Sequence, residues 1–593
     1  MMNINFYKRG KMSYLERVDS PSDIKQMNIE ELKDLAVEIR QAILKRNSII
    51  GGHVGPNLGM TDATIALHYV FNSPVDKIVF DVSHQCYAHK IITGRKHGFT
   101  NPEYYDKISG YTAPSESEHD NFVVGHTSTS ISLASGLAKA RDLMGQKHNV
   151  IAVIGDGSLS GGEALEGLDY ASAELKSNFI IVVNDNDMSI AENHGALYDN
   201  LRLLRKTNGQ AELNMFKAWG YDYLYVEKGN DIASLIDAFN KVKDSTKPVV
   251  VHLNTLKGKG YSLAEENKEP WHWHLPFDVD TGDTKFNFSG ENYNDITYDF
   301  LKNKIVEEGK VVVLTAGTPG VFGLSLDKRK ALGKNYVDVG IAEEHAVAMS
   351  SGLAKAGCKP VFCVMSSFIQ RTYDQLSQDL AMNKNPAVIL VFWGGISEAD
   401  ETHLCTFDMA MMNGIPNLIC LSPSTKQEYL AMLEGALSQN ENPVVIRVPK
   451  CVINGVEVSK NWNALTKAEV LDQGKDVAIL GLGNFVELGK NVAKALEEKG
   501  IKATLVNQRC SSDLDKNFLA NLSKEHSVVV TLEDGALAGG FGEKVASFYG
   551  ATDVKVLNFG ALKEFTNREK LDSIYSRYNL TVEQIVSKVM DII

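Results

Sequence analysis

The sequence predicts an α/β protein with three doubly wound domains and mainly parallel sheets. Short apolar runs rich in β-branched residues alternate with amphipathic stretches in three successive blocks, which is typical of strands joined by crossover helices. The runs at residues 150–154 and 180–183 are apolar at every position, so we expect strands that are buried on both faces. A chain of 593 residues has room for three or four such domains.

The block boundaries follow from changes in this pattern. The first block runs to about residue 290 and ends in a polar connection at residues 278–293. A strand at residues 311–316 opens the second block, and a strand at residues 477–483 opens the third. We therefore predict domains at residues 1–290, 291–455 and 466–593.

Composition and charge exclude several classes of protein. A formal net charge of −13 argues against a nucleic-acid surface, because nucleic acids are bound by clustered Lys and Arg. Seven scattered cysteines without a Cys-x-x-Cys pair predict neither a disulfide framework nor a zinc site. No segment approaches eighteen unbroken apolar residues, and the first residues lack a signal-peptide pattern. We expect a cytoplasmic protein that acts on small molecules and binds neither nucleic acid nor membrane.

Two polar side chains follow the first pair of predicted strands. Asp156 comes directly after the run in VIAVIGDGS (150–158), and Asn186 follows the run in IIVVNDNDM (180–188). Both should lie at the carboxyl ends of neighbouring strands, where open α/β sheets bind ligands. Carboxylate and amide oxygens suit Mg2+, and the glycines that flank the aspartate let the backbone approach phosphates. Gly-Asp-Gly is common in turns, but both strands and Asn186 favour a site similar to those for thiamine diphosphate and magnesium.

A thiamine-dependent enzyme also needs a glutamate, from another domain, that hydrogen-bonds the aminopyrimidine ring of the cofactor. Residues 336–349, YVDVGIAEEHAVAM, offer Glu343 at the end of a strand and immediately before a helical run. The diphosphate block thus precedes the glutamate block. This is the transketolase-like order, whereas pyruvate-decarboxylase-like enzymes have the reverse order.

Five further motifs extend the likeness. They read GGHVGPNLG (51–59), FDVSHQCYAHK (80–90), GHTSTS (125–130), NDNDMS (184–189) and SSFIQRTYDQ (366–375). No single motif would be specific. Together, over about residues 30–560, they make the chain resemble the 1-deoxy-D-xylulose-5-phosphate synthase family of the transketolase superfamily.

The resemblance implies a role for each matching residue. The diphosphate would be held by His84, Gly125, His126, Thr127, Gly157 and Ser158. Magnesium would be ligated by Asp156, by Asn186, which also contacts the cofactor, and by the carbonyl of Met188. Tyr261 and Phe368 would lie along the cofactor, with Phe368 on the aminopyrimidine. The residues facing the reacting atoms would be Glu343, His53, His272, His403, Asp400 and Arg371.

These residue types suit the chemistry that the resemblance implies. Thiazolium C2 of the cofactor must lose a proton, and Glu343 would help by stabilising the imino tautomer of the aminopyrimidine. Its neighbour Glu344 is the alternative, although only Glu343 follows an Ile-Ala step as in the family. The thiazolium ring would be the electron sink after decarboxylation or carbon–carbon cleavage, and histidines can move the protons near neutral pH.

Less specific interpretations compete for the histidines. Any one of the fifteen can be a surface or structural residue, and the apolar helical contexts of His89 and His345 favour that interpretation for both. His274 competes with His272, which alone keeps the family's spacing to the Phe-Asp pair at residues 277–278.

The family's pattern changes where the acceptor would bind. The family has an Asp-Arg-Ala-Gly segment whose arginine grips the acceptor phosphate, and here Trp393 stands at that position. Lys450 replaces a second phosphate-binding arginine, so one bidentate fork is lost and another becomes a point charge. An insertion after the Asn-Asp-Asn strand is reduced to about residues 205–211, and residues 400–405 are one residue shorter than their counterpart. The predicted cofactor site is intact, while the predicted acceptor site is altered.

Three functions follow from these observations. The first is a thiamine-dependent transferase that condenses pyruvate with D-glyceraldehyde 3-phosphate and releases CO2; the resemblance also implies isoprene biosynthesis and a homodimer. The second is a transketolase-like paralogue with a different aldehyde acceptor or ketose donor, motivated by Trp393 and Lys450. The third, a non-catalytic descendant, predicts erosion at Glu343, Asp156 or Asn186, and none is seen.

Overall fold

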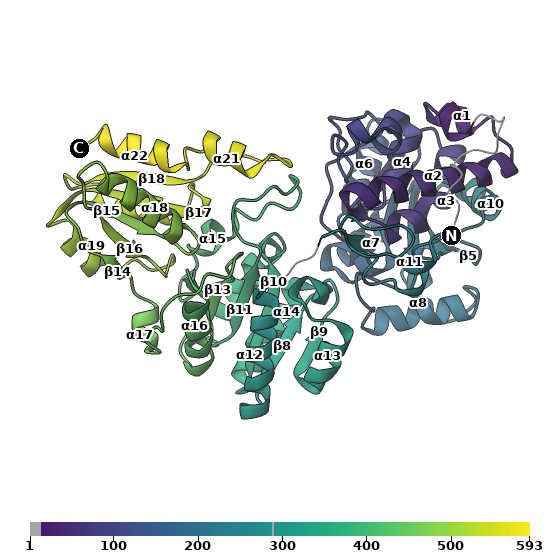
Figure 1. Ribbon diagram of the computed structural model, residues 1–593. Helices are drawn as coiled ribbons and strands as arrows, with labels where there is room; N and C mark the ends of the chain where they lie inside the picture. Colours follow the sequence, from purple (N-terminus) through teal and green to yellow (C-terminus); the bar gives the residue numbers. More distant parts are fainter. Residues whose placement is uncertain (1–12, 287–289) are drawn as a thin grey trace. The chain divides into compact units, whose positions relative to one another are not determined.

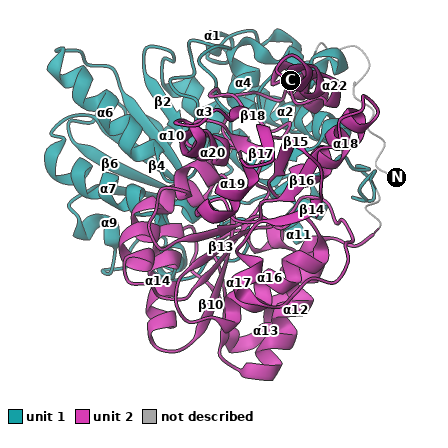
Figure 2. Cartoon of the chain, turned by 90° about the vertical axis from the view of Figure 1, so that its left-hand side faces the viewer, with its two compact units in different colours: residues 1–289 teal, residues 290–593 magenta. Residues whose placement is uncertain are grey.

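The computed structural model describes residues 13–286 and 290–593 (Figure 1). The chain forms two compact units, residues 1–289 and residues 290–593 (Figure 2). Within the described residues, three large and mainly parallel sheets are flanked by helices. The predicted α/β class with mainly parallel sheets is therefore confirmed.

The first unit is built on one parallel sheet with the strand order β2-β3-β4-β6-β5. These strands are β2 (Lys77–Phe80), β3 (Val150–Gly155), β4 (Phe179–Asp185), β5 (Asp222–Val226) and β6 (Pro248–Asn254). Alternate residues of β3 and β4 enter two different apolar clusters, one on each face. One face is covered by α2 (Ile29–Ile50), α3 (Gly55–Val70) and α10 (Ile232–Val242), the other by α6 (Ser130–Leu143), α7 (Gly162–Glu174) and α8 (Ala196–Lys206). Burial on both faces explains why these strands are apolar at every position.

The second unit begins with a parallel sheet in the order β12-β13-β11-β10-β8-β9. Its strands are β8 (Val311–Thr315), β9 (Tyr336–Asp338), β10 (Lys359–Met365), β11 (Val388–Phe392), β12 (Ile419–Leu421) and β13 (Val444–Arg447). Helices α12 (Tyr293–Glu308) and α16 (Lys426–Ser438) pack on one face, and α14 (Glu343–Lys355) packs on the other. The carboxyl ends of β9, β10 and β11 therefore meet at one edge.

A second sheet of the same unit has the order β14-β16-β15-β17-β18. Its strands β15 (Asp476–Gly481), β16 (Thr504–Asn507), β17 (His526–Ala536) and β18 (Lys555–Ala561) are parallel, and only the edge strand β14 (Glu469–Asp472) is antiparallel. Helices α18 (Phe485–Glu497) and α22 (Val582–Met590) cover one face, and α19 (Lys516–Leu522) and α20 (Phe541–Tyr549) cover the other.

Buried ion pairs join the two sheets of the second unit. The Arg447 guanidinium at the end of β13 binds both carboxylate oxygens of Asp408 at 2.9 Å and donates to the Asp534 carbonyl of β17 at 2.6 Å. Arg509, beyond β16, pairs with Glu428 of α16. These contacts make one compact unit of two sheets, so the predicted division into domains 291–455 and 466–593 stays a proposal. Among the described residues, no helix combines the length and the apolarity that a membrane crossing requires.

Candidate active site

The end of β3 carries the predicted metal-binding aspartate. Because Gly155 pairs with Asn184 of β4, Asp156 and the turn at residues 186–188 leave the sheet at the same edge. The Asp156 carboxylate is 1% exposed and accepts hydrogen bonds from the Met188 backbone N–H at 3.1 Å and from the Asn193 amide at 2.8 Å. The structure thus brings the three predicted metal ligands, Asp156, Asn186 and Met188, into one loop cluster.

The donor set of this cluster fits a divalent cation. Burial raises the pKa of Asp156 to about 8, and the nearby Asp185 carboxylate adds to the shift. The Asn186 side-chain oxygen is buried and accepts no hydrogen bond from any described residue. A cation there would offset the burial of the carboxylate and satisfy the amide oxygen. Among residues 13–286 and 290–593, no group of three or more His, Cys, Asp or Glu side chains has the arrangement that would hold a metal ion by itself. The remaining ligands at Asp156 and Asn186 would therefore be backbone oxygen, the diphosphate and water.

A second layer of side chains holds this loop from behind. The Asp185 carboxylate receives two hydrogen bonds from Arg205 Nη1, both 2.6 Å, and one from His252 Nε2 at 2.8 Å. Arg205 also pairs with Asp187, whose φ of 60° marks the tight turn after Asn186. Burial alone would raise the pKa of Asp185, but the His252 and Arg205 hydrogen bonds hold it below its ordinary value. The sequence analysis placed Arg205 only in a shortened insertion. In the structure, Arg205 supports the loop at residues 185–188 through its contacts with Asp185 and Asp187.

The loop before α6 lies beside this cluster and includes Gly125, His126 and Thr127. Its end is fixed by Asp81, which accepts hydrogen bonds from the Ser128 N–H at 2.9 Å and the Ser130 N–H at 3.0 Å. Ser128 Oγ in turn donates to the Ser158 carbonyl at 2.8 Å. The predicted diphosphate residues 125–127 and 157–158 are therefore tied together through Ser128.

The two glycines that flank Asp156 differ in the space available for a side chain. A Cβ on Gly157 would lie 2.7 Å from Ser189 Oγ, so the protein itself excludes a side chain there. A Cβ on Gly155 would meet nothing within 4 Å, so this glycine borders open space. The predicted close approach of both glycines to phosphate stays a prediction, and for Gly157 the packing against Ser189 is an additional reason for glycine.

Three predicted site histidines meet in the first unit. The His53 ring lies edge-on to the rings of His84 and His272, with ring centroids 5.0 Å and 5.6 Å away. His84 and His272 stack on each other at 5.1 Å. Burial holds the pKa of His272 well below its ordinary value, and the neighbouring Lys257 adds to the shift. His272 is therefore a neutral imidazole near pH 7.

Two residues that the sequence did not single out organise this cluster. The Asn57 amide donates to the carbonyls of His53 at 2.9 Å and His84 at 2.6 Å, which fixes the spacing of the two loops. Lys257 Nζ lies 3.2 Å from His272 Nδ1, and burial lowers the pKa of Lys257 to about 7. Asn57 lies within the motif at residues 51–59 and Lys257 four positions before Tyr261, but their residue types alone gave no signal.

Tyr261, a predicted site residue, and His274, the alternative to His272, both pack against Trp271. Tyr261 packs edge-on against Trp271 at 5.0 Å, and its hydroxyl donates to the Val279 carbonyl at 2.9 Å. His274 stacks on the same Trp271 at 4.3 Å, with its Nδ1 2.7 Å from the Leu275 carbonyl. His272 lies with His53 and His84, whereas His274 packs on Trp271, and this difference favours His272 as the site histidine. Tyr261 packs in the same aromatic cluster as His274, and its place along the cofactor stays a prediction.

Glu343 is the first residue of α14, at the edge where β9 ends. Its carboxyl group is 4% exposed, and no described residue donates a hydrogen bond to its Oε2 atom. The nearest cation is Arg371, with Nη1 3.9 Å from Oε2. Burial raises the pKa of Glu343 to about 7, although the Arg371 guanidinium opposes the shift. The competing Glu344 is more exposed, and His345 is exposed, as expected for a surface residue.

The same edge of the second unit carries the predicted Phe368, Asp400 and His403. The Phe368 ring lies edge-on to His403 at 5.8 Å. His403 Nδ1 lies 3.6 Å from Asp400 Oδ1 and 2.8 Å from the Thr402 hydroxyl, which also binds Asp400. Burial would raise the pKa of Asp400, but the His403 and Thr402 hydrogen bonds hold it at about 2. The pair is therefore an ionised carboxylate that orients an imidazole.

The altered acceptor residues follow β11 and β13. Trp393 has a φ of 64° and is 52% exposed, so its indole points away from the core. Lys450 Nζ donates to the Ile396 carbonyl at 2.6 Å. Between them, Gly394 and Gly395 leave no room for a Cβ, which would overlap Arg447 or Asp534. At the two positions where the resemblance implies arginines, this chain thus has the exposed indole of Trp393 and the Lys450 ammonium group, which is hydrogen-bonded to the Ile396 carbonyl.

Known proteins share this organisation along nearly the whole chain. Residues 15–214 match the 1-deoxy-D-xylulose-5-phosphate synthase family, residues 294–454 the pyrimidine-binding domain of transketolase, and residues 466–585 the transketolase C-terminal domain. Among solved structures, a transketolase variant from Pichia stipitis is 17% identical, with a TM-score of 0.43 and coverage of 95% of this chain and 97% of its own.

Two curated relatives are similar over almost their full lengths. The 1-deoxy-D-xylulose-5-phosphate synthase of Symbiobacterium thermophilum is 38% identical and covers 97% of this chain and 94% of its own. That of Caldanaerobacter subterraneus is also 38% identical, with 97% and 98% covered. This transketolase-like family implies thiamine diphosphate as the cofactor. The chain belongs to the 1-deoxy-D-xylulose-5-phosphate synthase family of transferases.

Proposed function

We propose that the chain condenses pyruvate with a small aldehyde, with release of CO2, and that D-glyceraldehyde 3-phosphate is its first candidate acceptor. The observation that carries the proposal is the buried Glu343 carboxyl, whose pKa is raised to about 7 and whose Oε2 accepts no hydrogen bond from the described residues. Such a group can bind and exchange a proton with a ring nitrogen near neutral pH.

The proposal assigns the diphosphate and the metal to the first unit and the aminopyrimidine to the second, each unit taken by itself. Magnesium would be held by Asp156, Asn186 and the Met188 carbonyl, and the diphosphate by His84, Gly125, His126, Thr127, Gly157 and Ser158. Tyr261 and Phe368 would lie along the cofactor, with Glu343 on its aminopyrimidine. When bound, thiamine diphosphate supplies a carbon nucleophile and an electron sink.

The chain's own residues would move and hold the protons. His53 and His272 would donate hydrogen bonds to the oxygen atoms of the bound carbonyl groups. Because burial holds the pKa of His272 well below its ordinary value, its ring is a neutral imidazole with one N–H to donate. His403 would act in the same way in the second unit, held in one orientation by the ionised Asp400. Arg371, close to Glu343, would bind a substrate carboxylate or phosphate.

A second candidate function differs only in the acceptor or donor. Trp393 and the engaged Lys450 favour an acceptor without a phosphate, or a ketose donor as used by transketolases. Labelled pyruvate offered with a panel of phosphorylated and unphosphorylated aldehydes, with mass spectrometry of the products, separates the two. A strong preference for D-glyceraldehyde 3-phosphate eliminates the second function, and no CO2 release with any aldehyde refutes the first.

Two further features belong to this proposal. We propose a homodimer, because the family resemblance implies it, and a cytoplasmic location, because the seven cysteines are unpaired among themselves in the described residues. Light scattering of the purified chain tests the first, and fractionation of the native cells tests the second.

Replacing Trp393 with arginine should improve use of a phosphorylated acceptor. The new guanidinium would add a charge-assisted contact of about 1.5–3 kcal/mol, so KM for D-glyceraldehyde 3-phosphate should fall by about ten- to a hundredfold. Arginine would meet the same left-handed backbone as tryptophan, so no new strain is expected. The control is Trp219→Arg, which adds the same charge at another exposed tryptophan, in the first unit. An unchanged KM in the Trp393 variant would contradict the assignment of the acceptor site.

Replacing Arg205 with alanine should weaken magnesium binding. The change removes two hydrogen bonds to Asp185 and frees the turn that carries Asn186, so we expect magnesium affinity to fall about ten- to a hundredfold. Calorimetric titration of Mg2+ in the presence of thiamine diphosphate measures it. Arg202→Ala, which breaks an exposed ion pair with Asp199 on the same helix, is the matched control. Equal magnesium affinities in the two variants would show that the contacts of Arg205 do not support the loop at residues 185–188.

A further inference from the structure

Tyr111 is an aromatic residue beside the histidine cluster that no motif assigned. It lies in a loop of the first unit, is 9% exposed, and its ring lies edge-on to His53 with centroids 5.9 Å apart. His53 therefore has ring neighbours on three sides, namely His84, His272 and Tyr111. A ring packed in this way restricts the rotation of the imidazole.

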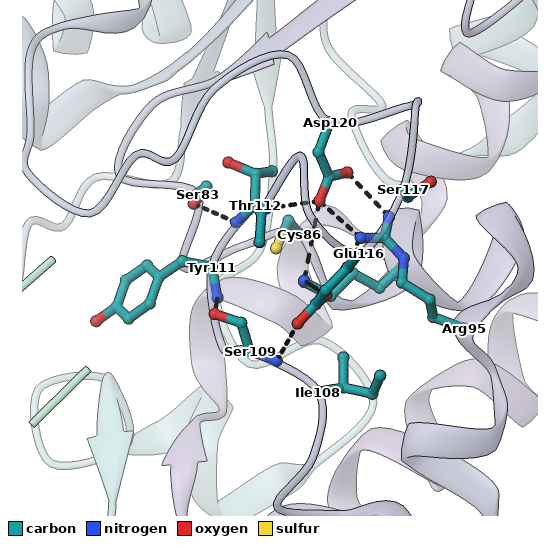
Figure 3. A network of polar contacts seen from close by, with 12 residues as sticks. Ser83, Cys86, Arg95, Ile108, Ser109, Tyr111, Thr112, Glu116, Ser117 and Asp120 are labelled. Carbon is teal, nitrogen blue, oxygen red and sulfur yellow. Dashed lines mark hydrogen bonds and ion pairs between the residues drawn. The ribbon is translucent and has the colours of Figure 1, made fainter. Parts of the chain in front are cut away.

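The loop around Tyr111 is held by side chains rather than by a regular strand (Figure 3). The Tyr111 N–H donates to Ser109 Oγ at 3.1 Å, and the Ser109 N–H donates to Glu116 Oε1 at 2.7 Å. The Thr112 N–H donates to Ser83 Oγ at 2.8 Å, and the Ala113 N–H donates to Asp120 Oδ2 at 2.7 Å. Two carboxylates, Glu116 and Asp120, thus fix the backbone on both sides of Tyr111.

These carboxylates are themselves held by buried cations. Arg95 binds Asp120 through two hydrogen bonds of 2.6 Å and 2.9 Å, and Lys90 binds Glu116 at 2.5 Å. His89 Nε2 lies 2.8 Å from Asp120. The side chains of Lys90 and Asp120 are fully buried, and Arg95 is 4% exposed.

Burying so many charges needs a reason beyond stability. Desolvation of paired charges often cancels their attraction, so apolar residues would hold a loop at least as well if only stability mattered. A fully bonded polar network has one geometry, whereas an apolar contact permits several. The network therefore suits a loop whose position must be fixed relative to a reacting group.

We propose that Tyr111 is a positioning residue that sets the orientation of the His53 imidazole, and that Glu116 and Asp120 hold it in place through the loop backbone. The proposal rests on the proposed function insofar as His53 faces the reacting atoms. It adds a residue that lies outside the motifs quoted above, and it gives the buried charges of residues 89–120 a role.

Three variants test the role of the Tyr111 ring. In Tyr111→Ala we expect kcat to fall by about ten- to a hundredfold, with affinity for thiamine diphosphate changed less than twofold. Tyr111→Phe keeps the ring and should restore kcat to within about threefold of the original. Tyr104→Ala is the matched control, because Tyr104 makes the same edge-on contact with His97 at 5.2 Å on a half-exposed part of the same segment, and its kcat should not change. An unchanged kcat in Tyr111→Ala overturns the proposal.

A readout without turnover separates this proposal from the proposed function. Diethyl pyrocarbonate modifies accessible histidines, and peptide mass spectrometry gives the modification rate of His53 itself. We expect that rate to rise several-fold in Tyr111→Ala and to stay unchanged in Tyr111→Phe and Tyr104→Ala. If the chain releases no CO2 from pyruvate but these rates behave as expected, the proposed function fails while the positioning role stands. Equal His53 rates in all variants overturn the positioning role.

The buried carboxylates are tested by a double-mutant cycle. Glu116→Gln keeps the shape of the side chain and should lower kcat in the same direction as Tyr111→Ala, by a smaller factor. If Glu116 acts through Tyr111, the double variant should be no slower than Tyr111→Ala alone. Multiplicative losses in the double variant would show that the two residues act independently and would overturn the second half of the proposal.

Discussion

Glu343→Gln should lower kcat by about 10²- to 10⁴-fold while leaving the fold and the affinity for the diphosphate unchanged. Glutamine has nearly the shape of glutamate and can hydrogen-bond a ring nitrogen, but it cannot give up or take a proton. Glu343 is suited to that transfer because burial raises its pKa to about 7 at the start of α14. Labelled CO2 released from pyruvate in the presence of an aldehyde measures kcat, and calorimetry measures cofactor affinity.

The neighbouring glutamate provides the control for this prediction. Glu344 follows Glu343 on the same helical turn and is more exposed, so Glu344→Gln makes the same chemical change outside the buried position. Its kcat should stay within about twofold of the original. Undiminished turnover in Glu343→Gln, or an equal loss in Glu344→Gln, would remove Glu343 from the proposed site.

Arg447→Met should destabilise the junction between the two sheets of the second unit by about 3–5 kcal/mol. The change leaves the buried Asp408 carboxylate without its cation and the Asp534 carbonyl without its donor, and such an uncompensated charge is expensive. Because a chain of several domains need not unfold in one step, hydrogen exchange of peptides from β13 and β17 is the proper measurement. Their slowest amides should exchange about 10²- to 10⁴-fold faster.

Arg577 provides the control for this prediction, because its ion pairs lie at the surface. Arg577 pairs with Glu564 and Glu569, and the three side chains are 38%, 37% and 31% exposed. Arg577→Met should therefore change local stability by less than about 1 kcal/mol. If Arg447→Met exchanged no faster than this control, the buried pair would not be what joins the sheets.

The sequence predicted the fold class because burial on both faces leaves a readable pattern. The strands around residues 150–154 and 180–183 are apolar at every position, and the structure places them in the middle of a parallel sheet. The meeting of His53, His84 and His272 was foreseeable only through family motifs. They are far apart in the chain, and no periodicity connects them.

The supporting residues were not predictable in this way. Asn57, Arg205 and Tyr111 act through contacts with residues outside their own helix or turn, and a lone asparagine, arginine or tyrosine has no distinctive sequence pattern. Their partners are set by tertiary packing, which local sequence does not encode. The packing of Gly157 against Ser189 was not predictable for the same reason, since Ser189 is thirty-two positions further along the chain.

The two glycines after Trp393 restrict how this enzyme could change its acceptor over evolutionary time. Returning to the family's Asp-Arg-Ala-Gly segment requires an alanine at position 394, and its methyl group would overlap the guanidinium of Arg447. That arginine secures the junction with the carboxyl-terminal sheet. The family's residue can therefore be introduced at position 393 alone, whereas an alanine at position 394 also requires a new packing of Arg447. A change of sequence next to Trp393 therefore also affects the contact of Arg447 that joins the two sheets of the second unit.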